Sequence, residues 1–240
     1  MIKKRRLKNI IFKFQKYLFF LFIKKKDKKI LKSSIKRNLK KETKKVDRQC
    51  FEALNSFFYD IPRIVDILKK DLDKYLDNDP ACNSIQEVIL MYPGFFCTMI
   101  YRIANSMYRH GVTVIPRFLS EIAHEMTGID IHPAAIIDEG LFIDHGTGIV
   151  IGETSEIGKN FKIYQGVTIG AKYINNGLKG IKRHPTIKDN VTVYANAVIL
   201  GGNTVIGNNA IIGCCAVVTH SVEDNKCVVK KEGTIEDDIQ

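Results

Sequence analysis

The sequence lacks the features that would assign the chain to several common classes. Within residues 1–46 the longest uncharged apolar run extends only from Tyr17 to Ile23, far short of the ~20 residues of a membrane-spanning helix. The six cysteines form no CxxC pair and no disulfide framework, so we expect reduced, structural thiols in a cytoplasmic protein. A GxSxG nucleophile elbow and a GxxxxGK[ST] phosphate loop are both absent, which argues against a serine hydrolase and a P-loop enzyme.

Acidic residues are scarce at the start of the chain. Residues 1–46 hold 19 Lys and Arg against 2 Asp and Glu, whereas the rest of the chain holds 18 against 24. We therefore predict a basic, disordered extension over residues 1–46. An amphipathic segment lying on an anionic membrane is the alternative. A nucleic-acid partner would depend on this tail alone, and we expect none.

Two periodicities divide the remainder. Over residues 47–128 apolar residues recur three and four apart, which predicts an α-helical domain. Over residues 129–218 branched apolar residues recur six apart, which is typical of a parallel β-helix whose hexapeptides each form one side of a triangular coil. The phase slips by two after Ile149. We expect the following residues to point inward: Ile131, Ile137, Ile143, Ile149, Ile151, Ile157, Ile163, Ile169, Ile187, Val193, Ile199, Val205, Ile211 and Val217.

The two domains are expected to have different roles. A solenoid end needs a cover, so capping and oligomerisation are a sufficient role for the helical domain. Residues 172–182 interrupt the period and should project as a loop, where ligands are usually met. Residues 219–240 show no repeat and are predicted to form a mobile C-terminal tail.

Several polar residues in the β-helix are not needed by the repeat: Asp130, His132, Asp144, His145, Arg183 and His184. Asp130 and the Asp144-His145 pair are about one coil apart, so we expect them to stack roughly 5 Å from each other. An Asp beside a His would make the imidazole a general base, and Arg183 suits a carboxylate. The three histidines lack metal-site spacing, and we expect no metal.

The blocks DIHPAAIIDEG, FIDHGTGIVIGET, IYQGVTIGA and KRHPTI occur in this order and resemble the signature blocks of serine O-acetyltransferase. The resemblance runs from about Asp79 to Val218. It implies an α+β chain with an N-terminal α-helical domain followed by a left-handed parallel β-helix. It also implies an acyltransferase that moves acetyl from acetyl-CoA to the hydroxyl of L-serine, on the way to cysteine.

The resemblance assigns roles to residues of the repeat. It implies that His145 is the general base, that Asp130 orients and charges it, and that Asp144 helps to bind serine. Arg183 and His184 would hold the substrate carboxylate.

Further roles concern the edges of the site. Asp79 and Pro80 would close the serine site from a neighbouring subunit. Gly170 and Ala171 would contact acetyl-CoA, and Ala171, which stands where many relatives have glycine, would border the serine as well. The CoA would lie between two subunits of a trimer, and helical domains would pair trimers into a hexamer.

Three departures from the family pattern stand out. The basic extension has no counterpart, and the Gly-x-Pro-Ala after the last coil is missing, which bears on CoA contacts and on inhibition by cysteine. Relatives that bind O-acetylserine sulfhydrylase use a C-terminal isoleucine, whereas Ile239 is followed by Gln240 here. Two other functions stay open: an O-acetyltransferase for another hydroxyl, such as a sugar, and a non-catalytic solenoid scaffold.

Overall fold

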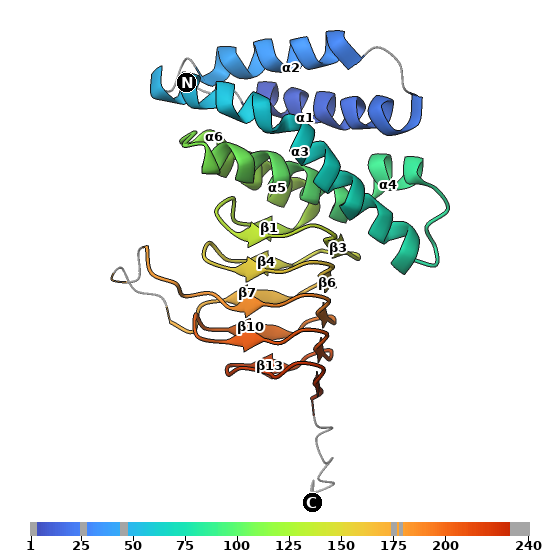
Figure 1. The fold of residues 1–240 in the computed structure, drawn as a ribbon, viewed down its shortest axis with the longest axis vertical. Coiled ribbons are helices and arrows are strands. Elements are labelled where there is room, and N and C mark those ends of the chain that lie inside the picture. Colours follow the sequence, from blue (N-terminus) through green and yellow to red (C-terminus); the bar gives the residue numbers. More distant parts are fainter. Residues whose placement is uncertain (1–3, 25–27, 44–47, 174–176, 178–179, 231–240) are drawn as a thin grey trace, which may run out of the picture.

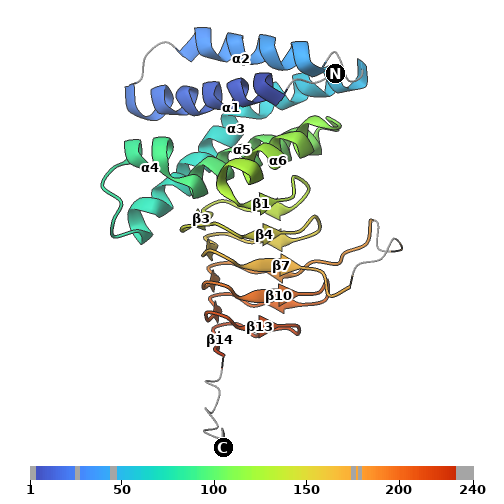
Figure 2. The same ribbon diagram turned by 180° about the vertical axis from the view of Figure 1, so that it is seen from behind.

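A layer of helices covers one end of a column of short strands (Figure 1). The computed structural model describes residues 4–24, 28–43, 48–173, 177 and 180–230. The helices are α1 (Lys4–Phe19), the π-helical turn η1 (Phe20–Lys24), α2 (Lys28–Thr43), α3 (Arg48–Asn78), α4 (Ile85–Met91), α5 (Pro93–Arg109) and α6 (Ile115–Thr127). Helices α1 and α2 form the outermost layer, and α5 and α6 lie next to the strands (Figure 2).

The basic segment is helical where the structure describes it, which differs from the predicted disorder. Helix α1 buries an apolar face made of Leu7, Ile10, Ile11, Phe14, Tyr17 and Leu18. This face packs on α2, α4 and α5, and the Gln15 side chain donates a hydrogen bond of 2.8 Å to the Ile89 carbonyl of α4. Lys16 is exposed, and Lys13 lies at the edge of this face, where its Nζ donates a hydrogen bond of 3.0 Å to Ser34 Oγ of α2. These interspersed lysines are why the charge pattern alone concealed the buried face.

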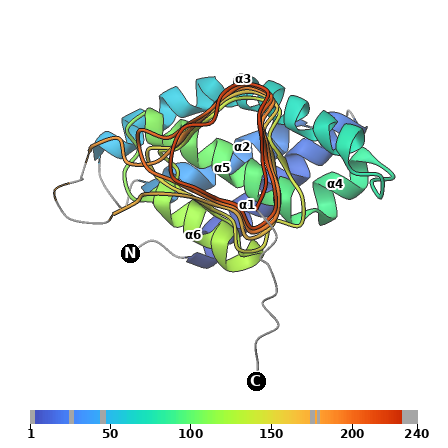
Figure 3. The same cartoon turned by 90° about the horizontal axis from the view of Figure 1, so that it is seen from below.

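The strands form three parallel sheets that wind into a β-helix, which confirms the predicted fold class. Viewed along the column, the coils superpose as a triangle (Figure 3). The first sheet contains β1 (Asp130–Ile131), β4 (Val150–Ile151), β7 (Thr168–Gly170), β10 (Val198–Leu200) and β13 (Val217–Val218). The second contains β2 (Ile136–Ile137), β5 (Glu156–Ile157), β8 (Thr186–Ile187) and β11 (Val205–Ile206), and the third β3 (Phe142–Ile143), β6 (Lys162–Ile163), β9 (Thr192–Val193), β12 (Ile211–Ile212) and β14 (Cys227–Val228).

The inward phase follows the hexapeptide prediction as far as Ile199 and then shifts by one residue. Ile206, Ile212 and Val218 are buried in the last coil, whereas the prediction placed Val205, Ile211 and Val217 inside. The register explains the shift, because the coil from Ile199 to its partner Val218 is one residue longer than the coil from Ile151 to Ile169. The extra residue lies in the turn between β10 and β11, where Thr204 Oγ1 donates a hydrogen bond of 2.7 Å to the Leu200 carbonyl.

The β-helix also continues past its predicted end. Strand β14 pairs with β12, and Val222 forms a bridge with Ile206, so residues 219–228 add to the column instead of forming a mobile tail. The C-terminal residues Ile239 and Gln240 lie outside the described residues.

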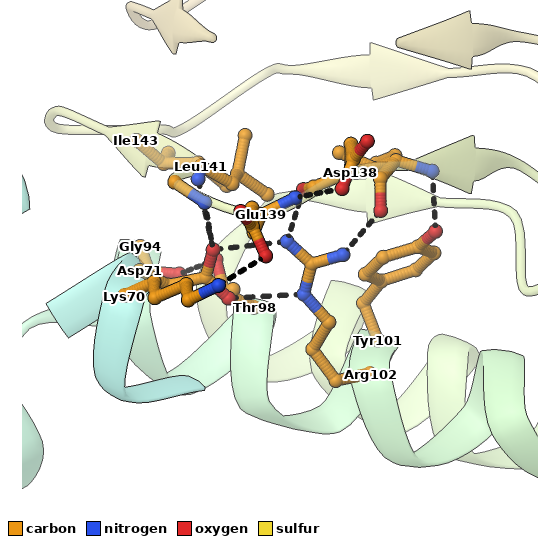
Figure 4. Close-up of polar contacts among 12 residues, drawn as sticks. Lys70, Asp71, Gly94, Thr98, Tyr101, Arg102, Asp138, Glu139, Leu141 and Ile143 are labelled. Atoms are coloured by element: carbon orange, nitrogen blue, oxygen red, sulfur yellow. Dashed lines mark hydrogen bonds and ion pairs between the residues drawn. The ribbon is translucent and has the colours of Figure 1, made fainter. Parts of the chain in front are cut away.

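A buried ion pair joins the helices to the first coil (Figure 4). Asp71 of α3 is fully buried and accepts two hydrogen bonds of 2.9 Å from the Arg102 guanidinium of α5. The same carboxylate accepts the Gly140 and Leu141 amides at 2.9 and 2.8 Å. Burial raises the pKa of Asp71, and the charge and hydrogen bonds of Arg102 oppose that shift. These bonds hold the second half of α3 over the turn between β2 and β3.

Within the described ranges, no single helix has both the length and the apolar composition to cross a membrane. The bent pair α4 and α5 passes the same test jointly across a 72° break, and the residues of α5 are mostly buried inside the protein.

Candidate functional site

The first polar group lies on the corner between β3 and β4. The coil from Asp130 to its partner Val150 is two residues longer than the next coil, from Val150 to Thr168, so the corner after Ile143 holds two additional residues. These residues make the turn protrude and carry Asp144 and His145. The His145 side chain is 70% exposed, and its Nε2 lies 3.7 Å from Asp144 Oδ2.

Asp79 joins this corner from the helical domain. It follows the last turn of α3, and its Oδ2 accepts a 2.7 Å hydrogen bond from the Tyr92 hydroxyl, which raises the pKa of Tyr92. Burial raises the pKa of Tyr164, with the charges of Asp144 and Asp79 adding to the shift. Asp79 and Asp144 of one chain thus lie within electrostatic range of Tyr164. We call Asp79, Tyr92, Asp144, His145 and Tyr164 the acidic corner.

Two contacts between α3 and the β-helix hold Asp79 near the corner after β3. The ion pair of Asp71 anchors α3, and one turn further along the helix the Tyr75 hydroxyl accepts the Ile143 amide at 3.4 Å. Tyr75 also packs edge-on against Phe142 of β3, with ring centroids 5.0 Å apart. The last turn of α3 is thus held against the residues that lead into Asp144. Asp79 therefore lies on the side of its own Asp144, and its closing of a neighbouring subunit's serine site stays a prediction.

Asp130 occupies a different position from the one predicted. Its strand β1 belongs to the sheet of β4, whereas β3 belongs to another sheet, so Asp130 pairs with Val150 and not with Asp144 or His145. In the described part of the chain no hydrogen bond or ion pair joins His145 to Asp130. The corner does abut the segment before Asp130, because a Cβ on Gly146 would lie 2.5 Å from Ile129 Cδ1.

The second polar group lies around the segment between β7 and β8, where the chain re-enters the β-helix. The Arg183 guanidinium donates to Glu153, which lowers the pKa of Glu153. Thr154 Oγ1 accepts the backbone amides of Arg183 and His184 at 2.9 and 3.1 Å. We call Glu153, Thr154, Arg183 and His184 the arginine corner.

The ring of His184 is held in one orientation and one tautomer. Its Nδ1 accepts the Thr154 amide at 3.0 Å, so the proton of the neutral ring is on Nε2. The ring lies directly against Gly152, where an added Cβ would overlap Cδ2 and Nε2. Burial, with the charge of Arg183, lowers the pKa of His184 to about 4. At neutral pH His184 is therefore an Nε2–H donor without charge.

A groove runs along the coil beside the arginine corner, with a volume of about 210 Å³. Its walls are Ala171, Lys172, Tyr173, Lys182, Arg183, Gly201, Gly202 and Asn203. Position 202 requires glycine, because a Cβ there would overlap the Lys182 carbonyl oxygen. The predicted contact residue Ala171 thus lines a groove bounded by two lysines, while Gly170 ends β7 and packs against Leu200.

The two corners do not meet within one chain. The acidic corner precedes β4, and the arginine corner follows β4 and precedes β8, so the width of the first sheet separates them. His145 forms no hydrogen bond with His184 in the described ranges. Each corner therefore carries half of the predicted chemistry.

Sequence reasoning missed Glu153, Thr154, Tyr92 and Tyr164. Glu153 and Thr154 stand in the quoted block FIDHGTGIVIGET, but an acid and a hydroxyl after a strand carry no specific signal until their partners in a later coil are known. No group of three or more His, Cys, Asp and Glu side chains gathers as a metal site among the residues that the structure describes.

Comparisons with known proteins agree with one another. The family model "Serine acetyltransferase, N-terminal" matches residues 17–98. The serine acetyltransferase of Bacillus subtilis is 47% identical over 124 residues, which are 52% of this chain and 55% of that protein. The Helicobacter pylori serine acetyltransferase is 47% identical over 52% of this chain and 70% of its own length. The chain spans about half the length of most of the first curated relatives it matches.

Solved structures extend the similarity. Serine acetyltransferase isoform 3 of Entamoeba histolytica, in complex with cysteine, superposes with a TM-score of 0.84 at 34% identity, covering 97% of this chain and 82% of that one. The Neisseria gonorrhoeae serine acetyltransferase in complex with serine gives 0.67 at 37% identity, covering 75% and 72%. Since the first match covers nearly the whole chain, most of the basic segment has a structural counterpart, contrary to the expectation from the sequence.

Proposed function

The chain belongs to the serine acetyltransferase family, and we propose that it transfers the acetyl group of acetyl-CoA to the hydroxyl of L-serine, giving O-acetyl-L-serine and CoA. The observation that carries the proposal is that one β-helix bears both an acidic corner and an arginine corner, on opposite edges of its first sheet. An amino-acid zwitterion needs an anionic partner for its ammonium group and a cationic one for its carboxylate. Asp79 and Asp144 supply the first, and Arg183 supplies the second.

His145 is the proposed general base. Its exposed imidazole takes the proton of the serine hydroxyl as the oxygen attacks the thioester carbonyl carbon. The tetrahedral oxyanion then collapses, the carbon–sulfur bond breaks, and the imidazolium returns the proton to the CoA thiolate. A positioned base contributes typically 10²–10⁴-fold to such a step. Asp144, 3.7 Å from the ring, stabilises the imidazolium. Orientation of the ring by Asp130 stays a prediction, since no hydrogen bond joins the two side chains in the described ranges.

In this proposal the residues of the arginine corner bind the serine carboxylate and take no part in the proton transfer. Arg183 presents a guanidinium braced by Glu153, and His184 presents the Nε2–H that Thr154 selects. A neutral His184 donor strengthens carboxylate binding without placing a second full charge beside Arg183. Rejection of alanine follows from the unpaired polar groups that a missing hydroxyl would leave in the site.

A complete site then requires a second copy of the chain. We propose that the acidic corner of one subunit meets the arginine corner of its neighbour in a trimer, with acetyl-CoA along the groove at Ala171. The lysines of that groove suit the phosphates of CoA. A pairing of two trimers, and a sulfhydrylase bound through the C-terminal tail, remain predictions.

The experiment that tests the reaction is release of free CoA from acetyl-CoA by the purified protein. L-serine, L-alanine, L-homoserine and a galactoside are compared as acceptors. We expect release with L-serine. Equal release with the galactoside would indicate a different hydroxyl acceptor, and no release with any of them from a folded oligomer would favour the scaffold.

Two variants test the assigned roles. His145→Ala should lower kcat by at least about 10²-fold and leave the oligomer intact, and the exposed His220→Ala provides the matched control. Arg183→Ala should mainly raise the KM for serine and spare that for acetyl-CoA. Near-normal activity of His145→Ala, or an equal loss for both substrates in Arg183→Ala, would contradict the respective role.

A further inference from the structure

Tyr92 belongs to the acidic corner, but the acetyl transfer proposed above gives it no role. It is the residue between α4 and α5, and its backbone is extended, with φ −76° and ψ 117°. Pro93 explains this conformation, because the residue before a proline is kept out of the helical region. The local sequence thus specifies the break between the two helices, and the break places the Tyr92 hydroxyl 2.7 Å from Asp79 Oδ2.

A close approach of α5 to the β-helix determines where Tyr92 lies. A Cβ on Gly94 would overlap the Ile143 carbonyl oxygen and would lie 2.9 Å from the Tyr75 hydroxyl. Glycine at position 94 therefore lets the first turn of α5 touch the residue that precedes Asp144. The Tyr92 ring packs edge-on against Tyr75, with ring centroids 5.6 Å apart. This packing holds the ring in place without help from the hydroxyl.

The side chain and the backbone of Asp79 are both held by hydrogen bonds. Its Oδ1 accepts the Ala81 amide at 2.8 Å, and its Oδ2 accepts the Tyr92 hydroxyl at 2.7 Å. The Asp79 amide donates to the Tyr75 carbonyl at 3.1 Å, and its own carbonyl accepts the Cys82 amide at 3.0 Å. Because each carboxylate oxygen has its own donor, the rotation of the carboxylate is restricted as well as its position. A carboxylate has about four lone-pair sites, so it can still accept the N–H groups of an ammonium ion.

The two donors to the carboxylate differ in origin. The Ala81 amide belongs to a local turn that begins at Asp79, a turn that aspartate commonly forms. Tyr92 comes from the start of another helix and reaches the second oxygen across the fold. Its hydrogen bond to Asp79 raises the pKa of Tyr92, so the hydroxyl stays protonated at neutral pH and remains a donor.

We propose that Tyr92 is a positioning residue that holds the Asp79 carboxylate in the orientation that receives the ammonium group of serine. This role rests on the proposed acetyl transfer, in which Asp79 and Asp144 pair with that group. With the Tyr92 hydroxyl in place, the carboxylate is ordered before serine binds, so binding does not have to supply the free energy of ordering it. Tyr92 takes no part in the proton transfer, and its loss should weaken serine binding and spare the chemical step.

The variant Tyr92→Phe tests this role, because it removes the hydroxyl and keeps the ring that packs on Tyr75. We expect the KM for serine to rise about 3- to 10-fold, the factor for ordering one side chain on binding. The kcat and the KM for acetyl-CoA should stay within about 2-fold of the wild type. Tyr59→Phe on α3 is the matched control, since its side chain is 86% exposed, and it should change neither constant. Circular dichroism establishes that both variants are folded.

A double-mutant cycle with Asp79→Ala tests whether Tyr92 acts through Asp79. In the Asp79→Ala protein, the additional change Tyr92→Phe should alter kcat/KM for serine by less than about 2-fold, because the group that Tyr92 positions is already absent. A bond that only attaches the loop after α3 to α5 would give the same factor in both backgrounds, and that result would overturn the proposal.

Two other results of the kinetics would also overturn it. These are a KM for serine in Tyr92→Phe within about 2-fold of the wild type, and an equal rise of the KM for both substrates. Either result, obtained with a wild-type protein that releases CoA in the presence of serine, would refute the role of Tyr92 alone. Absence of CoA release by the wild type would refute the proposed acetyl transfer, and the role of Tyr92 with it.

Discussion

The substitution Asp71→Asn isolates the buried contact between the helical domain and the β-helix. Asparagine has nearly the same volume as aspartate, so packing is conserved while the negative charge and one acceptor are lost. The amide oxygen can still accept the Gly140 and Leu141 amides. The amide nitrogen would then face the Arg102 guanidinium, donor against donor.

The expected loss of stability depends on the hydrogen bonds that Arg102 keeps in the variant. Removing one partner of a buried ion pair costs about 3–5 kcal/mol, because the other charge stays buried without compensation. Arg102 still donates to the carbonyls of Ile137 and Asp138, so we expect the lower end, about 3 kcal/mol. Because Asp79 follows the helix that this contact anchors, the KM for serine should rise more than that for acetyl-CoA.

Urea unfolding followed by circular dichroism, at one fixed chain concentration, measures the loss of stability. The matched control is Asp73→Asn on the same helix, whose exposed side chain should change the free energy of unfolding by no more than about 0.5 kcal/mol. A loss below about 1 kcal/mol for Asp71→Asn, well under the range for a broken buried pair, or one equal to that of the control, would refute the reasoning.

Three further predictions concern the arginine corner. Thr154→Val removes the acceptor of two backbone amides, each worth about 1–3 kcal/mol when left unpaired, so the KM for serine should rise about 10-fold while Thr154→Ser stays near wild type; steady-state kinetics with both substrates checks this. Gly152→Ala should abolish serine binding by displacing the His184 ring, and unchanged calorimetric affinity for serine would contradict it. The pKa of His184 is about 4 in the folded protein and roughly 6.5 in the unfolded chain, so the unfolded state binds more protons between these pH values. The contribution of His184 to the free energy of unfolding should therefore be fully present above pH 6.5 and fall by about 2–3 kcal/mol as the pH drops to 4. Urea unfolding at both pH values should show this loss in the wild type and a smaller one in His184→Gln.

The β-helix could be predicted from the sequence. A six-residue period of Ile and Val is a local signal, since each hexapeptide forms its own side of the coil and needs no knowledge of distant residues. The slip of two residues after Ile149 coincides with the longer corner between β3 and β4, which holds Asp144 and His145. The irregular segment before Arg183 precedes the arginine corner.

How these parts meet depends on the tertiary fold. The single residue added after β10 moves the inward position from Val205 to Ile206, and two adjacent apolar residues at each strand made both phases fit the pattern. The apolar face of α1 became interpretable only against α4 and α5.

The pairing of the buried polar residues also depends on the tertiary fold. Asp71 and Arg102 stand on different helices, and Thr154 and His184 stand in different coils, so no local pattern pairs them. A buried charge or a fixed tautomer depends on a partner that the fold brings into contact. For that reason the separation of the acidic corner from the arginine corner emerged from the structure and not from the sequence.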